Sequence, residues 1–219
     1  MLSERLLRGL GLALLAPAAA ATLLIVTAAG CGPTERPPPG GWVARRDTAR
    51  LKALVARAAD RRRVPRGVLL GLVERESSWD PAAKSPTGAT GMLQFTAATA
   101  RDFGLVVRPG RDDRLDPVRS ADAGARYLRL LWRDLAGARD ATERWRLAVA
   151  AYNRGPGTTR KALAAAKAAR VWDGSWASLL QERFWDSPAG FVEVRRHVQK
   201  ILGERGPAAG YARLYGYGG

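Results

Sequence analysis

Cysteine and histidine are almost absent from this chain, which has one of each among its 219 residues. The lone cysteine, Cys31, has no partner within the chain, so no intramolecular disulfide can form and the fold must depend on its hydrophobic core. The lone histidine, His197, has no recognisable partner ligands in the sequence, which disfavours a metal site. We therefore expect neither a metal nor another cofactor.

Acidic residues are also scarce, since 20 Asp and Glu stand against 36 Lys and Arg, for a formal net charge of +16. A surface this basic attracts polyanions, among which nucleic acid, an anionic cell wall and lipid headgroups are candidates. The basic residues are mostly arginines spread along the chain, and residues 61–63 form the only tight run. No zinc-finger spacing and no aromatic RNA-binding motif is present, so we do not expect a nucleic-acid partner.

The sequence lacks the alternating pattern of half-buried strands, apart from a short candidate at residues 105–107. Apolar residues recur instead at helical spacing, which predicts an all-α domain. We expect this single domain to cover residues 44–205. The predicted helices cover residues 47–62, 65 or 66 to 76, 96–103, 120–135, 142–153, 158–170, 176–182 and 191–202.

The first thirty residues have the pattern of a signal peptide. Arg5 and Arg8 precede an almost uniformly apolar run, and small residues stand just before Cys31. This arrangement resembles a bacterial lipobox, which implies a lipidated Cys31 and an exported protein held at a membrane that faces the cell wall. Gly32 after the cysteine resembles a signal for the outer membrane. Ordinary cleavage and an uncleaved apolar anchor are the alternatives.

Two further segments lie outside the predicted domain. Residues 31–43 are rich in proline and glycine, which is typical of an extended, semi-rigid tether. Residues 206–219 are rich in glycine and tyrosine, and we expect them to form a loose tail on the surface.

Glu76 is the strongest candidate for a catalytic residue. If residues 66–76 form a helix, Leu69, Leu72 and Val73 share the face on which Glu76 falls, whereas Glu74 points to solvent. A carboxyl on an apolar face loses hydration, which raises its pKa towards the range that suits a general acid near neutral pH. The alternative is a structural glutamate that bonds backbone N–H groups at the helix end.

The segment after Glu76 is rich in turn residues. Residues 77–94 read SSWDPAAKSPTGATGMLQ, a loop that is long for a compact helical domain, and such loops are usually functional. With its Glu-Ser, Ser-x-x-Gly-Ala and Gly-Met-Leu-Gln sequences, the stretch resembles the first motifs of the soluble lytic transglycosylase family.

Further motifs of this family follow in the family's order. Residues 115–117 and 123–128 resemble its central helix, and residues 150–157 (AAYNRGPG) resemble its Ala-Tyr-Asn-x-Gly box. Residues 184–186 and 193–198 resemble its closing segment, most closely that of the membrane-bound lytic transglycosylase D branch. The likeness spans residues 50–202, and independent matches in one order make it specific.

The resemblance implies a lysozyme-like fold and a peptidoglycan substrate. We expect the protein to be a monomer. The resemblance also implies that Glu76 protonates the oxygen between N-acetylmuramic acid and N-acetylglucosamine and then, as a base, takes the proton of the sugar's C6 hydroxyl, which yields a 1,6-anhydro product. Tyr152 is expected to bond Glu76 or the N-acetyl group, and Asn153 the backbone of its helix end. The residues expected to bind the glycan are Ser77, Ser85, Gly91, Met92, Gln94, Tyr152, Asn153 and Glu193.

Glycosidases usually use two carboxylates, and only Glu76 is placed like a catalytic one. Asp80 precedes a proline, which is typical of a turn. A hydrolytic muramidase of the goose-type lysozyme kind remains the nearest rival, because it would share the acid and the fold. An inactive cell-wall-binding lipoprotein is a second rival, although intact Glu76, Gln94 and Tyr152 argue against it.

The sequence departs from the family pattern in two places. Thr96 and Ala97 stand where Met-Pro is usual, and Thr96 is a candidate N-cap for the helix that follows. In the closing segment Val194 replaces threonine and His197 replaces tyrosine. These departures affect the expected details of glycan binding and leave the candidate acid intact.

Overall fold

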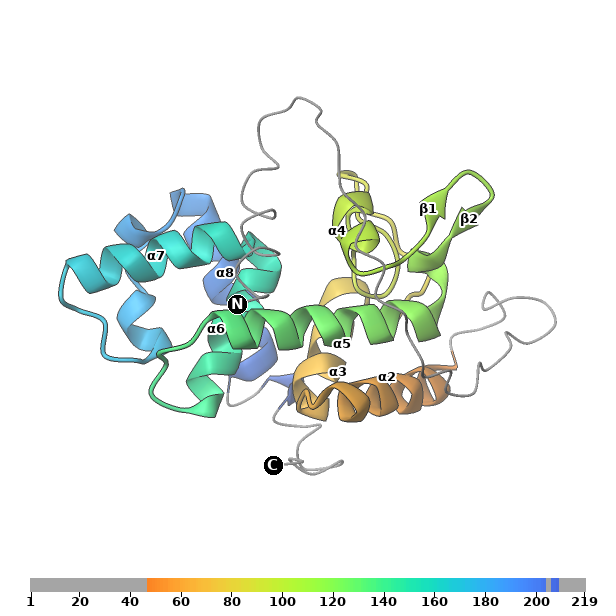
Figure 1. The fold of residues 1–219 in the computed structure, drawn as a ribbon, viewed down its shortest axis with the longest axis horizontal. Helices are drawn as coiled ribbons and strands as arrows, with labels where there is room; N and C mark the ends of the chain where they lie inside the picture. The colour runs from red at the N-terminus through yellow and green to blue at the C-terminus, as the bar shows by residue number, and fades with distance from the viewer. Residues whose placement is uncertain (1–46, 204–205, 209–219) are drawn as a thin grey trace, which may run out of the picture.

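Figure 1 shows the computed structural model, which describes residues 47–203 and 206–208 of the chain. The regular secondary structure of the described part is almost wholly helical, so the predicted all-α class is confirmed. Its α-helices are α2 (Thr48–Arg62), α3 (Arg66–Ser77), α4 (Ala97–Asp102), α5 (Pro117–Asp134), α6 (Ala141–Arg154), α7 (Pro156–Ala168) and α8 (Pro188–Leu202).

Helix α5 crosses the middle of the molecule in Figure 1 and connects its two ends. Helices α6, α7 and α8 gather at one end, whereas α4 and a small β-hairpin lie at the other. Helix α2 packs along α5 and α3, and α6 packs against both α5 and α8. The core runs through these contacts, and its fully buried side chains include Leu70, Leu128, Leu147 and Ile201.

Side-chain caps explain where the helices begin. The Asp116 carboxylate accepts hydrogen bonds from the backbone N–H groups of Val118 and Arg119 at 2.9 and 3.1 Å, so α5 begins three residues before the predicted residue 120. The predicted N-cap role of Thr96 is confirmed, because its hydroxyl accepts from the Thr99 N–H at 3.2 Å. Ser187 caps α8 in the same way.

The prediction of one helix over residues 176–182 is wrong. Two 3-10 turns, η2 (Trp176–Leu179) and η3 (Glu182–Phe184), stand there, and Gln181 between them has extended backbone geometry. The break lets the Trp185 indole N–H donate to the Leu179 carbonyl at 2.9 Å. Both tryptophan rings of this segment, Trp176 and Trp185, are thereby buried.

The short strand lies slightly later than predicted. Strand β1 (Val107–Arg108) pairs antiparallel with β2 (Arg111–Asp112), and Gly110 takes a positive φ of 77° in the turn between them. Leu105, which was expected in the strand, is buried in the core instead.

Residues 206–208, which were expected in the loose surface tail, pack against the domain. Residues 206–208 are described, and Ala208 is 3% exposed because it packs against α3. A Cβ atom at Gly67 would lie 2.6 Å from the Ala208 carbonyl oxygen, so this close approach requires glycine. The predicted signal peptide, the lipidation site Cys31, the tether to residue 43 and residues 209–219 of the tail lie outside the described residues.

Candidate active site

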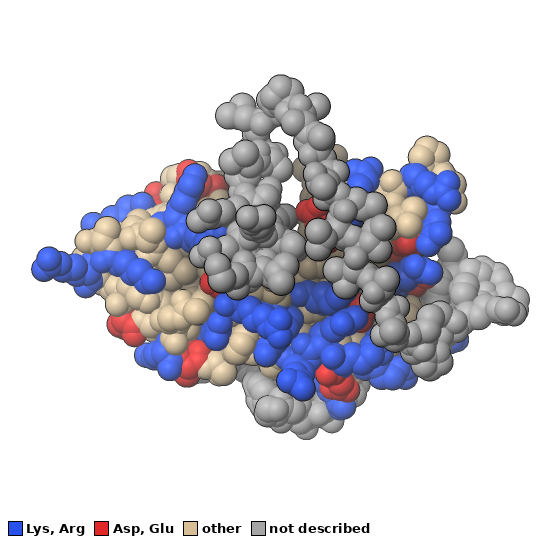
Figure 2. Space-filling view, in the orientation of Figure 1, with Lys and Arg blue, Asp and Glu red and all other residues tan. Residues whose placement is uncertain are grey.

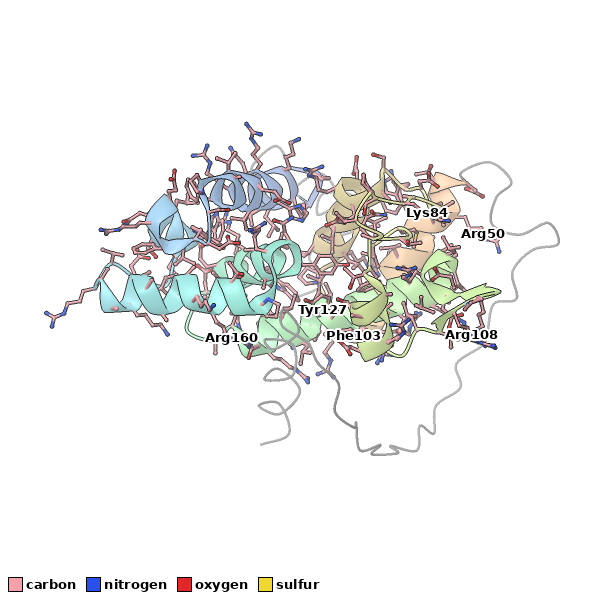
Figure 3. The ribbon with its side chains drawn as sticks, turned by 90° about the horizontal axis from the view of Figure 1, so that it is seen from above. Arg50, Lys84, Phe103, Arg108, Tyr127 and Arg160 are labelled. Carbon is pink, nitrogen blue, oxygen red and sulfur yellow. The ribbon has the colours of Figure 1, made fainter. Side chains whose placement is uncertain are left out.

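A cleft of about 580 Å³ opens where α3, the loop after it, α5, α6 and α8 meet. Tyr127 of α5 lines it, and in the view from above in Figure 3 this side chain lies between Arg160 on α7 and Arg108 on the hairpin. The cleft walls bring together six of the residues predicted from sequence to form the site, namely Glu76, Ser85, Gln94, Tyr152, Asn153 and Glu193.

Glu76 occupies the last turn of α3, and its side chain is 18% exposed. Burial raises the pKa of this carboxyl to about 7, an effect that Arg75 opposes and the negative charge of Glu193 reinforces. The predicted rise in pKa is therefore confirmed. Glu74, two residues earlier, is exposed, as the helical phase predicts.

His197 makes the one contact to the Glu76 carboxylate that qualifies as an ion pair by distance among the described residues. Its Nε2 atom lies 3.5 Å from the Glu76 Oε1 atom, and its side chain is 4% exposed. Burial first, and then the charge of Arg75, lower the pKa of the imidazole to about 4. Within the described part of the chain this buried Nε2 atom has no hydrogen-bond partner, Glu76 included. His197 is thus neutral at physiological pH and faces the acid.

Sequence reasoning singled out His197 as a departure from the family pattern and missed its contact with Glu76. One signal was available, because His197 lies four residues after Glu193 and therefore on the same face of α8. The crossing of α8 over α3, which brings this face to the acid, could not be inferred from local periodicity.

Glu193 is held by two neighbours from α6. Asn153 Nδ2 donates to Glu193 Oε1 at 3.1 Å, and Arg154 Nη1 donates to Oε2 at 3.3 Å. Arg154 also bonds Asp186. The expectation that Asn153 holds a helix backbone is therefore not met, because its amide N–H group bonds the Glu193 carboxylate across the cleft.

Tyr152 is tied to the loop and not to the acid. Its hydroxyl donates to the Leu93 carbonyl at 2.7 Å, and its ring lies 5.2 Å from that of Tyr127 and 6.2 Å from that of Phe95. No hydrogen bond to Glu76 is formed, in contrast to one of the two expectations. The negative charge of Glu76 still contributes to the raised pKa of Tyr152, after burial, which places the two groups near each other.

The loop after α3 is braced by its own polar side chains. The Ser85 hydroxyl accepts from the Ala89 N–H at 3.0 Å and lies 2.9 Å from the Thr87 hydroxyl. The Gln94 amide donates to the carbonyls of Gly91 and Ala83 at 2.9 and 3.3 Å. These bonds fix the wall of the cleft beside Glu76.

Arg114 anchors the same loop, and sequence reasoning missed it. Its Nη1 donates to the carbonyls of Gly88 and Phe95 at 3.1 Å each, while Asp112 binds its other nitrogens. A Cβ atom at Gly91, where φ is 83°, would lie 1.9 Å from the Arg114 carbonyl oxygen. Gly91 thus has a packing reason to be glycine.

Residues 53–173 match the family described as the transglycosylase SLT domain. The chain belongs to this family. The match covers more than half of the chain and includes the acid, the loop and Tyr152. The match confirms the family that the order of the motifs predicts.

Curated relatives carry the name membrane-bound lytic murein transglycosylase F. The protein from Vibrio campbellii is 32% identical over 154 residues, which cover 62% of this chain and 28% of that relative. A relative from Alkalilimnicola ehrlichii, named transglycosylase F 2, is 42% identical over 94 residues, covering 43% of this chain and 20% of the relative. The SLT chain therefore spans less than a third of the length of these relatives.

Solved structures of SLT relatives share the fold. The soluble lytic transglycosylase Slt70 from Escherichia coli superposes with a TM-score of 0.57 at 25% identity, covering 75% of this chain and 24% of that one. An inactive glutamate-to-glutamine mutant of Slt from Pseudomonas aeruginosa superposes with a TM-score of 0.56 at 25% identity, covering 76% and 24%. The predicted lysozyme-like transglycosylase fold agrees with these neighbours.

Three of the predicted glycan-binding residues do not reach the cleft wall. Met92 is fully buried in the core, and Gly91 packs on Arg114. The Ser77 hydroxyl donates to the Val73 carbonyl of its own helix at 3.2 Å. Asp80 accepts a hydrogen bond from the Ala82 N–H at 3.0 Å, as a turn residue does, and does not line the cleft.

No group of histidine, cysteine, aspartate and glutamate side chains suited to a metal ion occurs in the described ranges. Among the helices of residues 47–203 and 206–208, none has the length and apolar character needed to span a membrane.

Proposed function

We propose that this chain is a peptidoglycan lytic transglycosylase that cleaves the β-1,4 bond between N-acetylmuramic acid and N-acetylglucosamine and leaves 1,6-anhydromuramic acid ends. Glu76 carries the proposal, because it is a largely buried carboxyl with a pKa near 7 in the wall of the cleft. Membership in the SLT family supports it. So does the similar Slt of P. aeruginosa, in which a glutamate-to-glutamine mutant is inactive.

In the mechanism that the family implies, Glu76 gives its proton to the glycosidic oxygen as the bond to the muramic anomeric carbon breaks. The N-acetyl group of the same sugar stabilises the positive charge that develops on this carbon. The Glu76 carboxylate then takes the proton of the sugar's C6 hydroxyl, and the C6 oxygen closes on the anomeric carbon. The proton returns to Glu76, and no water is consumed.

His197 is proposed to keep the proton on Glu76. A protonated imidazole 3.5 Å from the carboxyl would favour the carboxylate and lower its pKa. Because burial holds the pKa of His197 near 4, the imidazole stays neutral over the range in which Glu76 must remain protonated.

A hydrolytic muramidase, the alternative function, would need a second carboxylate to activate water. Glu193 is the second carboxylate in the cleft, but it is exposed and shared between Asn153 and Arg154. Because both oxygens of Glu193 already accept hydrogen bonds from side chains of α6, this carboxylate is better placed to position groups at the cleft wall than to take a proton from water. This arrangement favours the anhydro route through Glu76 alone. If the chain were an inactive cell-wall-binding lipoprotein, the raised pKa of Glu76 would have no function.

Mass analysis of the products from purified peptidoglycan tests the proposal. The transglycosylase reaction gives muropeptides that are lighter by one water than the corresponding lysozyme products, and the full chain should yield these anhydro ends. The Glu76→Gln variant should yield no fragments, whereas the matched Glu74→Gln variant should act like the wild type. Reducing ends in place of anhydro ends would assign the chain to the muramidases.

We further propose that the mature protein begins at a lipidated Cys31 and that residues 31–43 tether a catalytic domain of residues 44–205 to a membrane on its wall-facing side. The sequence motif and the membrane-bound names of the relatives support this. The closing segment around Glu193 and His197 resembles the D branch, whereas the relatives are named F. A monomer suffices, because α3, α5, α6 and α8 of one chain form the cleft.

A further inference from the structure

An arginine-rich face lies on another side of α5 from the cleft. Arg126, Arg129 and Arg133 recur on α5 at spacings of three and four residues, so they share one helical face, whereas Tyr127 lines the cleft. With Arg61, Arg62 and Arg63 from the end of α2 they line a hollow of about 570 Å³. Figure 2 shows Lys and Arg atoms gathered where α5 and α2 lie.

The acidic residues of this face, Asp60, Asp102 and Asp122, neutralise only part of its positive charge. Asp122 binds Arg62 at 2.8 Å and Arg126 at 3.3 Å, and Asp60 binds Arg66 at 2.7 Å. Arg63, Arg129 and Arg133 have no ion pair with any carboxylate in the described residues. We call these three side chains the arginine cluster.

The positive charges of the arginine cluster lie close enough to repel one another. The pKa of Arg129 is lowered by burial first and then by the positive charges of Arg133, Arg144 and Arg63. Four like charges within reach of one another oppose folding unless an anion offsets them. Conflicts between local energetics and the fold are expected where a surface has a function.

An apolar floor adjoins the arginine cluster. A second hollow, of about 580 Å³, shares Arg63 and Arg129 with the first. Trp132 and Leu202 are half-buried in its wall, over the buried side chains of Val64, Val68 and Trp145. Two guanidinium groups lie over the Trp132 ring, that of Arg129 at 4.2 Å and that of Arg144 at 3.8 Å from its centroid. The face therefore combines unpaired positive charge with aromatic and aliphatic surface.

From this combination we infer that the arginine face docks the domain on a membrane surface, where Arg63, Arg129 and Arg133 bind the phosphate groups of acidic lipids. Arginine forms forked hydrogen bonds to phosphate, and tryptophan favours the interface between water and lipid. A hydrophilic anionic polymer would match the charges but would offer no apolar contact to the half-buried Trp132 and Leu202. Docking through this face leaves the cleft, which opens elsewhere around α5, accessible to a glycan strand.

The test compares the full chain on phosphatidylcholine vesicles with and without phosphatidylglycerol, so that attachment through the N-terminal segment is the same in both. Phenylglyoxal labelling followed by peptide mass analysis reports the accessibility of single arginines. Labelling of Arg63 and Arg133 should be about tenfold slower on the acidic vesicles. Arg170, which is exposed beyond α7, should label at the same rate on both.

Two matched variants remove the same charge from different faces. The first variant replaces Arg63, Arg129 and Arg133 with glutamine. The second variant replaces Lys161, Lys167 and Arg170 with glutamine. Arg61, which both variants retain, should lose its protection on acidic vesicles in the first variant and keep it in the second. Since the first variant relieves repulsion, its thermal midpoint should not fall.

Three outcomes would overturn the inference. Equal labelling of wild-type Arg63 and Arg133 on both vesicles would do so without any variant. Equal loss of Arg61 protection in both variants would show that only net charge matters. If a soluble poly(glycerol phosphate) slows the labelling of Arg63 and Arg133 on neutral vesicles while acidic vesicles do not, the face binds a wall polymer. Cleavage of peptidoglycan does not enter these readouts, so the inference stands or falls apart from the proposed activity.

Discussion

Replacing Glu76 with glutamine should stabilise the domain at alkaline pH and change little at acidic pH. Burial raises the pKa of this carboxyl from 4.5 to about 7. Below pH 4.5 the group is neutral in the folded and the unfolded chain alike. As the pH rises, the unfolded chain ionises first, whereas the folded chain must keep the proton or bury a charge. The stability linked to Glu76 is therefore full below pH 4.5 and is lost as the pH rises through 7.

The magnitude follows from the shift. Each pKa unit corresponds to about 1.4 kcal/mol, so a rise from 4.5 to about 7 makes the folded state about 3 kcal/mol less stable above pH 7 than below pH 4.5. Since the side chain is 18% exposed, solvent screening reduces this value only modestly. In a chain of this size, about 3 kcal/mol corresponds to a shift of roughly 6 to 12 °C in the thermal midpoint.

The assay is thermal and denaturant unfolding of wild type, Glu76→Gln and Glu74→Gln between about pH 5 and pH 8.5. His197, whose pKa is lowered to about 4, destabilises the folded state as the pH falls, but it does so in all three proteins and cancels in the difference. The Glu76→Gln variant should gain on the wild type as the pH rises, while Glu74→Gln should follow the wild type. Parallel curves for wild type and Glu76→Gln would refute the burial of an uncompensated carboxyl.

Further predictions concern activity and location. The rate of cleavage should fall above about pH 7, where Glu76 loses its proton. If the wild-type rate also falls near pH 4, that fall should be absent from the His197→Asn variant. In NMR the single imidazole of the wild type should titrate near pH 4 and not near 6.5. Glu193→Gln should lower the rate by less than the roughly 10² to 10⁴-fold typical of a lost general acid, and a complete loss would favour a two-carboxylate hydrolase. Tyr152→Phe should loosen the loop at Leu93 and weaken glycan binding more than it slows the bond-breaking step, which separate KM and kcat values would check. Cys31→Ser should release the protein from membranes, and full retention would point to an uncleaved apolar anchor.

Local periodicity was sufficient to predict the main property of the candidate acid. The positions of Leu69, Leu72 and Val73 fix the buried face of α3, and burial in turn dictates the direction of the Glu76 pKa shift. Caps such as Thr96 are also local, because the side chain bonds a backbone group three residues away. Features of this kind depend on a few neighbouring residues and can be read from the sequence.

The partners of the acid could not be predicted in this way. His197 meets Glu76 only because α8 crosses α3, and the Glu193 carboxylate meets Asn153 only because α8 also packs on α6. Met92 belongs to a motif expected at the glycan, yet the tight turn at Gly91 directs its side chain into the core. Motif order identified the segments of the site, and the packing of helices decided which side chains face the cleft.

The end of α3 shows how the fold sustains an acid with an unfavourable environment. Directly after Glu76 and Ser77, Ser78 and Trp79 both adopt left-handed backbone geometry, with φ of 51° and 67°. Such residues cost about 1 to 2 kcal/mol each, and the burial of Trp79, which is 5% exposed, offsets part of that cost. Because the helix stops there, Glu76 lies in the last turn of α3, at the negative end of the helix dipole, which disfavours a carboxylate. The helix end therefore raises the pKa of Glu76, as burial does, and both effects favour the protonated carboxyl.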